Sequence, residues 1–593
     1  MTEDMPCIAS RLQTLRSQLQ LLDCHACLVP VADYCRSFPL APCERRLEWL
    51  SGFSGSAGMG AVSTTKAALF VDGRYTIQAR MQMRSTSFKI LDFRLTRIRK
   101  WLKNHVPSNG AIAIDARLHS DKDIKDLKSG LGKRKIVYID QLIDNIWHDQ
   151  PPSPRSAIFA HDVEYAGESR ESKIDKLVHF QIRKGLDSLV LNDCASIAWL
   201  LNIRGSDIPH TPIKHALATV SRHGLVTLCV NLPKDTAAPD WLGQQVVVRP
   251  FDEFDAHIAE LSGRVFVADT ARHRIIRQLR KTGAKLCRGS DPCEMLKAIK
   301  NPVQVAGFRN AHLRDGVALA EFLAWLDERI AAGKLSESEA ALQLLEFRGK
   351  SVWFRESSFE TISATGSNGA IIHYRVVPDT ERKLSDGDLY LVDSGGQYRD
   401  GTTDVTRTLP VGTVSPDHVR SYTLVLRGLI ALLTAKWPDK SEGRAIDALA
   451  RQFLWREQCD YAHGTGHGVG HFLSVHEGPA NISRLSNIPL KKGMVLSVEP
   501  GFYASGEYGI RLENLAVVEA CQPARDGQDR EFLQFSNLTV VPFDRRLIDH
   551  SLLSSEELRW LNDYHAKTRT SLNSQCSPRA QKWLQWACAP LKT

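Results

Sequence analysis

Four acidic residues and one histidine stand in this chain where an ionised side chain needs a partner. Asp393, Asp404, Glu499 and Glu513 border or enter apolar stretches, and His467 lies between the two pairs in a glycine-rich run. A charge at the end of a buried strand must be paired or bound to a cation, because an apolar environment penalises it. The pattern therefore predicts a metal site.

The number of carboxylates indicates the number of ions. Four carboxylates gathered at one place would be neutralised by two divalent cations, and the sequence shows no lysine cluster that could replace them. In two-metal hydrolase sites the ions lie roughly 3.5 to 4 Å apart and act together on the scissile group. Oxygen-rich ligation with one imidazole favours Mn²⁺, with Zn²⁺, Co²⁺ or Fe²⁺ as alternatives.

Buried strands are expected to position these residues. The apolar runs 389–392 and 494–498 read as strands that end at Asp393 and Glu499. Three glycines between Asp393 and Asp404 indicate a hairpin that returns the second carboxylate toward the first. The two aspartates should therefore lie on neighbouring strands.

The stretch 509–517 is predicted to be one further strand. Its alternation places Arg511 and Glu513 on the same face, since side chains in a strand point alternately to opposite sides. Arg511 should accompany Glu513 to the site. Its alternative role is simply to pair with that carboxylate.

These motifs and their flanks resemble those of the pita-bread metallopeptidases, and over nearly the whole chain the spacing is similar to the X-prolyl aminopeptidases (aminopeptidase P). The resemblance implies that Asp393 binds one metal ion and that His467 and Glu499 bind the other. It implies that Asp404 and Glu513 bridge both ions. Glu499 would also shuttle a proton.

The resemblance also implies residues that act on the substrate. His373, His463 and His476 would bind substrate or handle protons, although a half-buried histidine more often has only a structural role. Arg511 would join them in catalysis. Arg74, in Asp72-Gly73-Arg74-Tyr75, matches a first-domain motif whose arginine contacts the peptide, the alternative being a strand-end turn.

Two places depart from the family pattern. Where the family often reads Asp-x-His-x-Ser-Glu-Tyr, this chain has Asp33-Tyr34-Cys35-Arg36-Ser37-Phe38-Pro39. His471 stands where relatives carry a small residue, and it is interpreted as structural.

An internal duplication precedes the metal-binding region. The octapeptide that starts at Trp49 recurs from Trp199, and each copy follows an apolar strand, at 26–30 and 188–191. Chance similarity over so few positions is the alternative. Together with the resemblance, this repeat implies the fold class α/β (α+β): two related N-terminal creatinase-like α/β domains followed by a pita-bread catalytic domain.

Proline-rich and polar stretches suggest where these domains end. A helical run is expected at 311–330 and another at 422–437, the latter with Ser415 as its N-cap. A polar, mainly helical tail follows Pro542. The predicted division is residues 1–154 and 155–291 for the creatinase-like domains, 292–543 for the catalytic domain and 544–593 for a C-terminal extension.

Composition is that of a large enzyme. Hydrophobic residues make up 43% and charged residues 24% of 593 positions, which is ordinary globular usage. The net charge of +9 is small against 76 basic and 67 acidic residues, and short basic runs predict solvated surface rather than a nucleic-acid partner.

The expected location is the cytoplasm, without a membrane partner. The first residues lack the basic and apolar regions of a secretory signal, and 422–437 is too short to span a bilayer. The 13 cysteines are then expected to be free thiols. A zinc site is not expected at Cys24 and Cys27, because no second pair accompanies them.

The expected function is hydrolysis of peptides after an N-terminal residue that precedes proline, and a homodimer is a family expectation. Proline specificity comes from the resemblance, since no proline pocket can be read from the sequence. A prolidase-like Xaa-Pro dipeptidase shares the ligand set and is the alternative. A creatinase-like or metal-free binding protein of the same fold would be expected to lack several of the five ligands.

Overall fold

The computed structural model describes residues 4–84, 86–333, 335–522 and 531–592. The chain folds into two compact units. Unit 1 comprises residues 1–161 and 168–294, and unit 2 comprises residues 162–167 and 295–593. The division falls inside helix α11 (Pro292–Ala298). The finer, four-part division stays a prediction.

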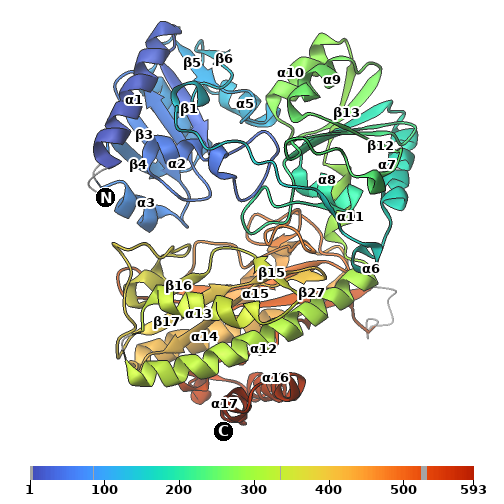
Figure 1. Ribbon diagram of the computed structural model, residues 1–593. Helices are drawn as coiled ribbons and strands as arrows, with labels where there is room; N and C mark the ends of the chain where they lie inside the picture. Colours follow the sequence, from blue (N-terminus) through green and yellow to red (C-terminus); the bar gives the residue numbers. More distant parts are fainter. Residues whose placement is uncertain (1–3, 85, 334, 523–530, 593) are drawn as a thin grey trace. The chain divides into compact units, whose positions relative to one another are not determined.

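Unit 1 contains two six-stranded sheets with equivalent topology (Figure 1). The first has the order β4-β3-β2-β1-β5-β6 and the second the order β12-β11-β10-β8-β13-β14. In each sheet the third strand in this order, β2 or β10, pairs antiparallel with both of its neighbours. All other neighbouring strands pair in parallel. The predicted duplication is confirmed, and Trp49 and Trp199 lie on the equivalent helices α2 and α8.

The strands of these two sheets and the α-helices of unit 1 have the following bounds. The strands are β1 (Ala26–Pro30), β2 (Met59–Ser63), β3 (Ala67–Val71), β4 (Phe88–Asp92), β5 (Ala111–Ile114), β6 (Lys135–Tyr138), β8 (Ser188–Leu191), β10 (Ala216–Ser221), β11 (Val226–Val230), β12 (Val246–Arg249), β13 (Arg264–Ala268) and β14 (Lys285–Gly289). The helices are α1 (Asp4–Leu21), α2 (Arg46–Ser51), α3 (Thr76–Gln82), α4 (Leu95–His105), α5 (Asp121–Lys128), α7 (Arg170–Lys184), α8 (Cys194–Leu201), α9 (Phe254–Ala259) and α10 (His273–Lys281). Both predicted strands, 26–30 and 188–191, are present as β1 and β8.

Unit 2 is built from two groups of helices and strands. One group packs α12 and α13 against the sheet β16-β17-β20, and the other packs α14 and α15 against the sheet β21-β28-β27-β24. The bounds are α12 (Pro302–Ala332), α13 (Glu337–Gly349), β16 (Ile362–Thr365), β17 (Leu389–Ser394), β18 (Gly396–Tyr398), β19 (Gly401–Thr402), β20 (Val405–Pro410), α14 (Pro416–Leu433), β21 (Lys436–Pro438), α15 (Gly443–Arg456), β22 (Gly466–His467), β23 (Asn481–Ile482), β24 (Val495–Val498), β25 (Gly501–Ala504), β26 (Tyr508–Arg511), β27 (Asn514–Ala520) and β28 (Phe532–Asn537).

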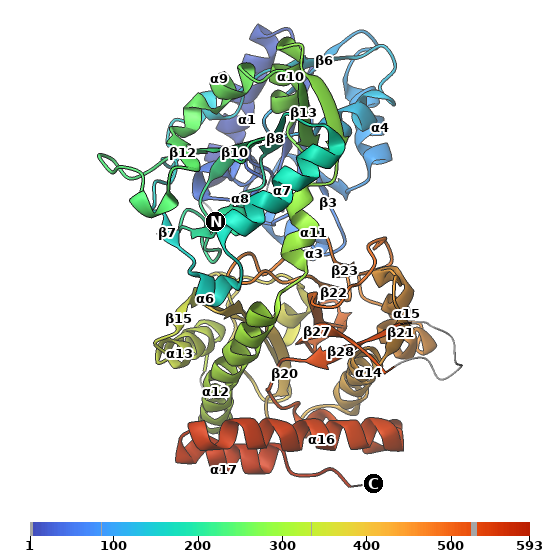
Figure 2. The ribbon, with the colours of Figure 1, turned by 90° about the vertical axis from the view of Figure 1, so that its right-hand side faces the viewer.

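The tail after residue 542 is helical, as predicted. Helices α16 (Ser555–Leu572) and α17 (Pro578–Ala587) lie side by side at one end of unit 2 (Figure 2). Buried side chains of both helices pack on α12, among them Leu572 and Leu584. Among the helices that the structure describes, not one has the length and apolar character needed to cross a bilayer.

The helix predicted for 422–437 is shorter than expected. Ser415 caps α14 as predicted, since its hydroxyl accepts from the His418 N–H, but the helix ends at Leu433. Trp437 instead belongs to β21 and pairs with Leu533 of β28. An apolar residue fits a helical pattern and a buried strand equally well. The predicted helix was therefore too long at its C-terminal end.

Candidate metal centre

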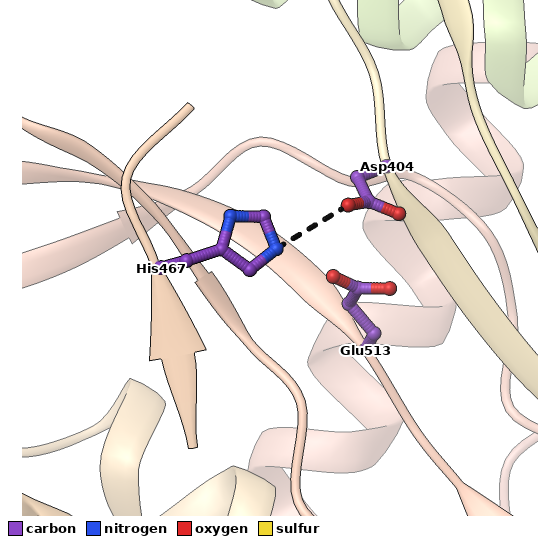
Figure 3. A group of neighbouring side chains, drawn as sticks. All are labelled: Asp404, His467 and Glu513. Carbon is purple, nitrogen blue, oxygen red and sulfur yellow. Dashed lines mark ion pairs between the residues drawn. The ribbon is translucent and has the colours of Figure 1, made fainter. Parts of the chain in front are cut away.

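Three of the five predicted ligands form a tight group in unit 2. One ligand atom from each of Asp404, His467 and Glu513 lies within 4.8 Å of the other two. The three side chains point toward one another from different segments (Figure 3), and His467 Nε2 is 3.5 Å from Asp404 Oδ2.

The other two predicted ligands border this group. Glu499 Oε1 lies 3.6 Å from His467 Nε2. Asp393 is close enough for its charge to raise the pKa of both Asp404 and Glu513, after the larger effect of burial. Four carboxylates and one imidazole from distant parts of the chain therefore meet at one place.

The strands bring the aspartates together as the glycine pattern predicted. Strands β17 and β20 are antiparallel, with Asp393 opposite Thr406, so that Asp404 immediately precedes the strand that returns beside Asp393. Glu499 follows β24, as predicted. Each acid therefore sits on or beside a buried strand.

The stretch 509–517 is not the continuous strand that was predicted. β26 ends at Arg511 and β27 begins at Asn514, so Leu512 and Glu513 lie between two strands. The Glu513 N–H donates to the carbonyl of Thr406, 3.1 Å away, which attaches this break to β20. Arg511 and Glu513 both reach the site, but through this turn rather than through alternation along one strand.

Electrostatics in the group favour a bound cation. Burial and then the neighbouring carboxylates raise the pKa of Asp404 and of Glu513 well above their ordinary values. Burial also raises the pKa of Glu499, although His467 and Arg511 oppose the shift. Like charges that cannot all ionise together in a buried site are the arrangement that metal ions relieve.

The donor atoms fit divalent metal ions. Within the described residues, the buried Oδ1 of Asp393 and Oε1 of Glu513 have no hydrogen-bond partner. His467 Nδ1 lies 3.0 Å from the carbonyl of Gly468, so this nitrogen carries the proton and Nε2 faces the carboxylates. An imidazole oriented by a backbone carbonyl through its second nitrogen is the usual form of a histidine ligand.

A chain of hydrogen bonds leads from Asp393 to His463. Arg511 donates from Nη2 to Asp393 Oδ2 at 2.6 Å and from Nη1 to the Tyr503 hydroxyl at 2.8 Å. The Tyr503 hydroxyl lies 2.9 Å from His463 Nε2, and His463 Nδ1 lies 2.7 Å from the carbonyl of Gly464. Burial raises the pKa of Tyr503 to about 12 despite Arg511, so the hydroxyl keeps its proton and can donate it to His463.

Tyr503 is a residue that the sequence analysis missed. It lies on β25, where it pairs with Gly509 of β26. A signal was present, because Tyr503 follows Glu499 by four residues in a strand that returns toward Arg511.

The remaining predicted residues occupy different places. The rings of His476 and His467 have centroids 4.1 Å apart. His476 therefore lies directly beside the ligand group, which comprises the five predicted donors Asp393, Asp404, His467, Glu499 and Glu513. His373 is half-buried in the loop after the turn 366–370. That turn packs tightly on β26, since a Cβ on Gly509 would lie 1.7 Å from the carbonyl oxygen of Gly369.

Arg74 was predicted to contact the substrate and His471 to be structural. Arg74 belongs to unit 1, where its guanidinium donates to both carboxylate oxygens of Asp72 at 3.0 and 2.7 Å. Its contact with peptide stays a prediction. His471 is buried and meets the ring of Phe308 edge-on, with centroids 5.5 Å apart, which agrees with a structural role.

Arg407 supports the site from behind. Its fully buried guanidinium donates to the carbonyl of Glu513 at 2.6 Å and to the carbonyls of Val541 and Pro542 at 2.6 and 3.0 Å. It also lies 3.2 Å from the Tyr564 hydroxyl on α16. The backbone at Glu513 is thereby fastened to the C-terminal segment.

Models of known families match almost the whole chain. The Creatinase/Prolidase N-terminal domain matches residues 11–146 and, in a second form, residues 149–304. Metallopeptidase family M24 matches residues 306–520, and the C-terminal region of peptidase M24 matches residues 531–591.

Curated relatives agree over the full length. The probable Xaa-Pro aminopeptidase P of Laccaria bicolor is 39% identical, with 98% of this chain and 93% of that protein aligned. That of Aspergillus niger is 37% identical, with 98% and 99% aligned. The chain belongs to metallopeptidase family M24, with the creatinase-like and pita-bread domains that were expected.

Among solved structures, the similarity extends to an X-prolyl aminopeptidase from Caenorhabditis elegans, described as a cytosolic enzyme with a di-nuclear active site. It has a TM-score of 0.93 and 32% identity, covering 98% of this chain and 100% of that one. The prolidase from Pyrococcus horikoshii OT3 shares the fold over 64% of this chain and 100% of its own, with a TM-score of 0.50 and 20% identity.

Proposed function

We propose that this protein is a dinuclear metallo-aminopeptidase that releases the N-terminal residue from peptides with proline in the second position. The observation that carries the proposal is the convergence of Asp393, Asp404, His467, Glu499 and Glu513 in a buried group. Full-length similarity to Xaa-Pro aminopeptidases P supports the substrate class.

The five donors would divide between two ions. Asp393 would hold one ion, His467 and Glu499 the other, and Asp404 and Glu513 both. When bound, such a pair of divalent cations lowers the pKa of water and polarises the scissile carbonyl. The oxygen-rich donor set supports Mn²⁺, with Zn²⁺ or Co²⁺ as alternatives.

Glu499 is proposed to move the proton of the reaction. It takes a proton from the attacking water and gives it to the nitrogen of proline, which leaves as a secondary amine and must gain a proton to do so. The Glu499 carboxylate borders His467 at 3.6 Å, beside the place of the scissile bond in this proposal, and positioned acid–base groups contribute typically 10² to 10⁴-fold.

The histidines and arginines are proposed to hold the peptide. His373, His463 and His476 bind the substrate or handle protons, and donors among them that face the developing charge on the carbonyl oxygen stabilise it. Arg511 holds Asp393 and, through Tyr503, orients His463. Arg74 is proposed as a further peptide contact.

Two assays test the function. Metal should be measured per purified chain, and hydrolysis of Arg-Pro-Pro should be compared with that of Xaa-Pro dipeptides after loading with Mn²⁺, Zn²⁺ or Co²⁺. Faster release of arginine from the tripeptide is expected. A prolidase-like enzyme would prefer the dipeptides.

A cytoplasmic location and a homodimer are also proposed. The similar nematode enzyme is described as cytosolic, which supports the location. The dimer rests on the family expectation alone. Cell fractionation would test the location, and light scattering of the purified protein would test the dimer.

A further inference from the structure

Helix α15 carries an ion pair that is buried in unit 2. Asp447 and Arg451 stand four residues apart, one turn of helix, and both are 2% exposed. Arg451 Nε donates to Asp447 Oδ2 at 2.7 Å. A buried pair of this kind is weak evidence of stabilisation, because desolvation offsets most of the attraction. Its position therefore calls for another explanation.

The other nitrogens of the Arg451 guanidinium donate hydrogen bonds to the loop that carries His463. Nη1 donates to the carbonyl of Tyr461 at 2.8 Å and to Asp460 Oδ1 at 2.7 Å. Nη2 donates to the carbonyl of His463 itself at 2.8 Å. The guanidinium carbon also lies 3.8 Å from the centre of the Tyr461 ring. One rigid group thus fixes three points of the loop.

Asp447 holds the next part of the same loop. Its Oδ1 accepts from the Thr465 hydroxyl at 2.5 Å, and that hydroxyl is 2.6 Å from the hydroxyl of Tyr461. The carbonyl of Thr465 accepts from the N–H of Glu499 at 2.8 Å, and β22 with His467 follows directly. Arg451 therefore fixes the loop at His463 itself, and Asp447 fixes it at Thr465.

We propose that Arg451, together with Asp447, is a positioning residue that sets the place of His463 relative to the ligand group. The inference rests on the proposed function, in which His463 acts on the peptide. The guanidinium is suited to the task because it is planar, always charged and able to donate in several fixed directions, whereas a lysine ammonium cannot reproduce that fork.

The test is a double-mutant cycle on full-length, metal-loaded protein. Arg451→Lys, His463→Ala and the double variant are assayed on Arg-Pro-Pro, with metal measured per chain. Arg451→Lys is expected to lower kcat/KM by about 10- to 100-fold, as small displacements of catalytic groups do. The relative changes in kcat and in KM should match those of His463→Ala, and the Arg451→Lys variant should retain its metal.

The double variant decides the matter. If Arg451 acts through His463, adding Arg451→Lys to His463→Ala produces little further loss, because the two effects are not additive. A full additional loss in the double variant would overturn the proposal, as would wild-type activity in Arg451→Lys. Hydrolysis of Arg-Pro-Pro by the wild type is measured first, so a failure of the proposed function is recognised separately.

Two further variants keep the test decisive. Asp447→Asn removes the charge and leaves one acceptor in place of the two that serve Arg451 and Thr465. It should show the same lack of additivity with a smaller loss, even where Arg451→Lys does not fold. Arg427→Lys is the matched control: Arg427 is half-buried on α14, pairs with Glu557 and lies 4.2 Å from the Phe453 ring. It should leave kcat/KM within about twofold of wild type.

Discussion

His467 and His476 have ring centroids only 4.1 Å apart, yet the two side chains are expected to contribute differently. His467 directs Nε2 toward Asp404 and Glu499, whereas His476 is assigned to the peptide. His476→Ala and His373→Ala should therefore lose activity and keep their metal, with losses of about 2.7 to 4 kcal/mol in transition-state stabilisation. His467→Ala should lose both.

Elemental analysis and kinetics on the same preparations check this division. Metal per chain should fall in His467→Ala alone. Loss of metal in all three variants, or retention in all three, would contradict it.

Glu499→Gln is expected to reduce hydrolysis at least about a thousandfold, because the amide neither holds the exchanged proton nor ligates metal as a carboxylate does. Steady-state rates of the folded variant provide the measurement. Glu507→Gln is the control, since Glu507 is exposed between β25 and β26 and should stay near wild type. Substantial activity in Glu499→Gln would remove this residue from the mechanism.

Removal of metal should lower the melting temperature. The folded apo-protein must keep the buried carboxylates together, and burial and mutual repulsion already raise the pKa of Asp404 and Glu513. A ligand at a hundredfold excess over its Kd stabilises the folded state by about 2.7 kcal/mol. Calorimetry with and without chelator measures the shift, and Asp404→Asn should respond much less. An unchanged melting temperature after confirmed metal removal would argue against a tight site.

Tyr503→Phe should reduce kcat about 10- to 150-fold, which corresponds to the roughly 1.5 to 3 kcal/mol of a hydrogen bond to a charged group. The hydroxyl accepts from Arg511 at 2.8 Å and faces His463, and phenylalanine can do neither. Tyr508→Phe on β26 provides a comparison, since it loses only a hydroxyl contact of 3.2 Å with Ser421. Equal rates in the two variants would exclude the role given to Tyr503.

The stability of unit 1 should depend on pH through His215. Burial alone would lower its pKa, but Asp33, whose Oδ2 is 3.4 Å away, outweighs this effect and the pKa rises to about 9. A folded-state pKa above the ordinary value of about 6.5 means that the stabilisation is complete below pH 6.5 and is lost as the pH rises through 9. The contribution is of the order of 3 kcal/mol.

The measurement is the melting temperature of the full chain and of His215→Gln between pH 6 and 10. The advantage of the wild type should shrink across this range. A constant difference would show that the imidazolium does not stabilise the fold.

The convergence of the candidate ligands could be predicted from sequence, because several of them border apolar runs. Asp393 and Glu499 terminate apolar runs, and glycines between Asp393 and Asp404 indicate the hairpin that joins them. The break between β26 and β27 was not predictable from alternation, since apolar and polar residues continue to alternate from Ile510 to Leu512 and apolar residues resume at Leu515. Long-range bonds hold the turn, among them those of Glu513 with Thr406 and with Arg407.

The roles of Arg407 and Arg451, which support the site, could not be predicted from sequence, because they depend on contacts that form only in the folded chain. Arg407 contacts groups more than 100 positions later in the chain, and Arg451 contacts a loop whose importance depends on where it packs. Such cations look like surface arginines in a sequence. Their function follows from tertiary structure alone.

The attachment of Glu513 to the C-terminal segment through Arg407 has a consequence for biosynthesis. The carbonyls of Val541 and Pro542 and the hydroxyl of Tyr564 are the last parts of this network to leave the ribosome. A nascent chain that has already exposed all five donors still lacks the groups that fasten Glu513. The network that fastens Glu513 can therefore form only after the residues up to Tyr564 have been translated.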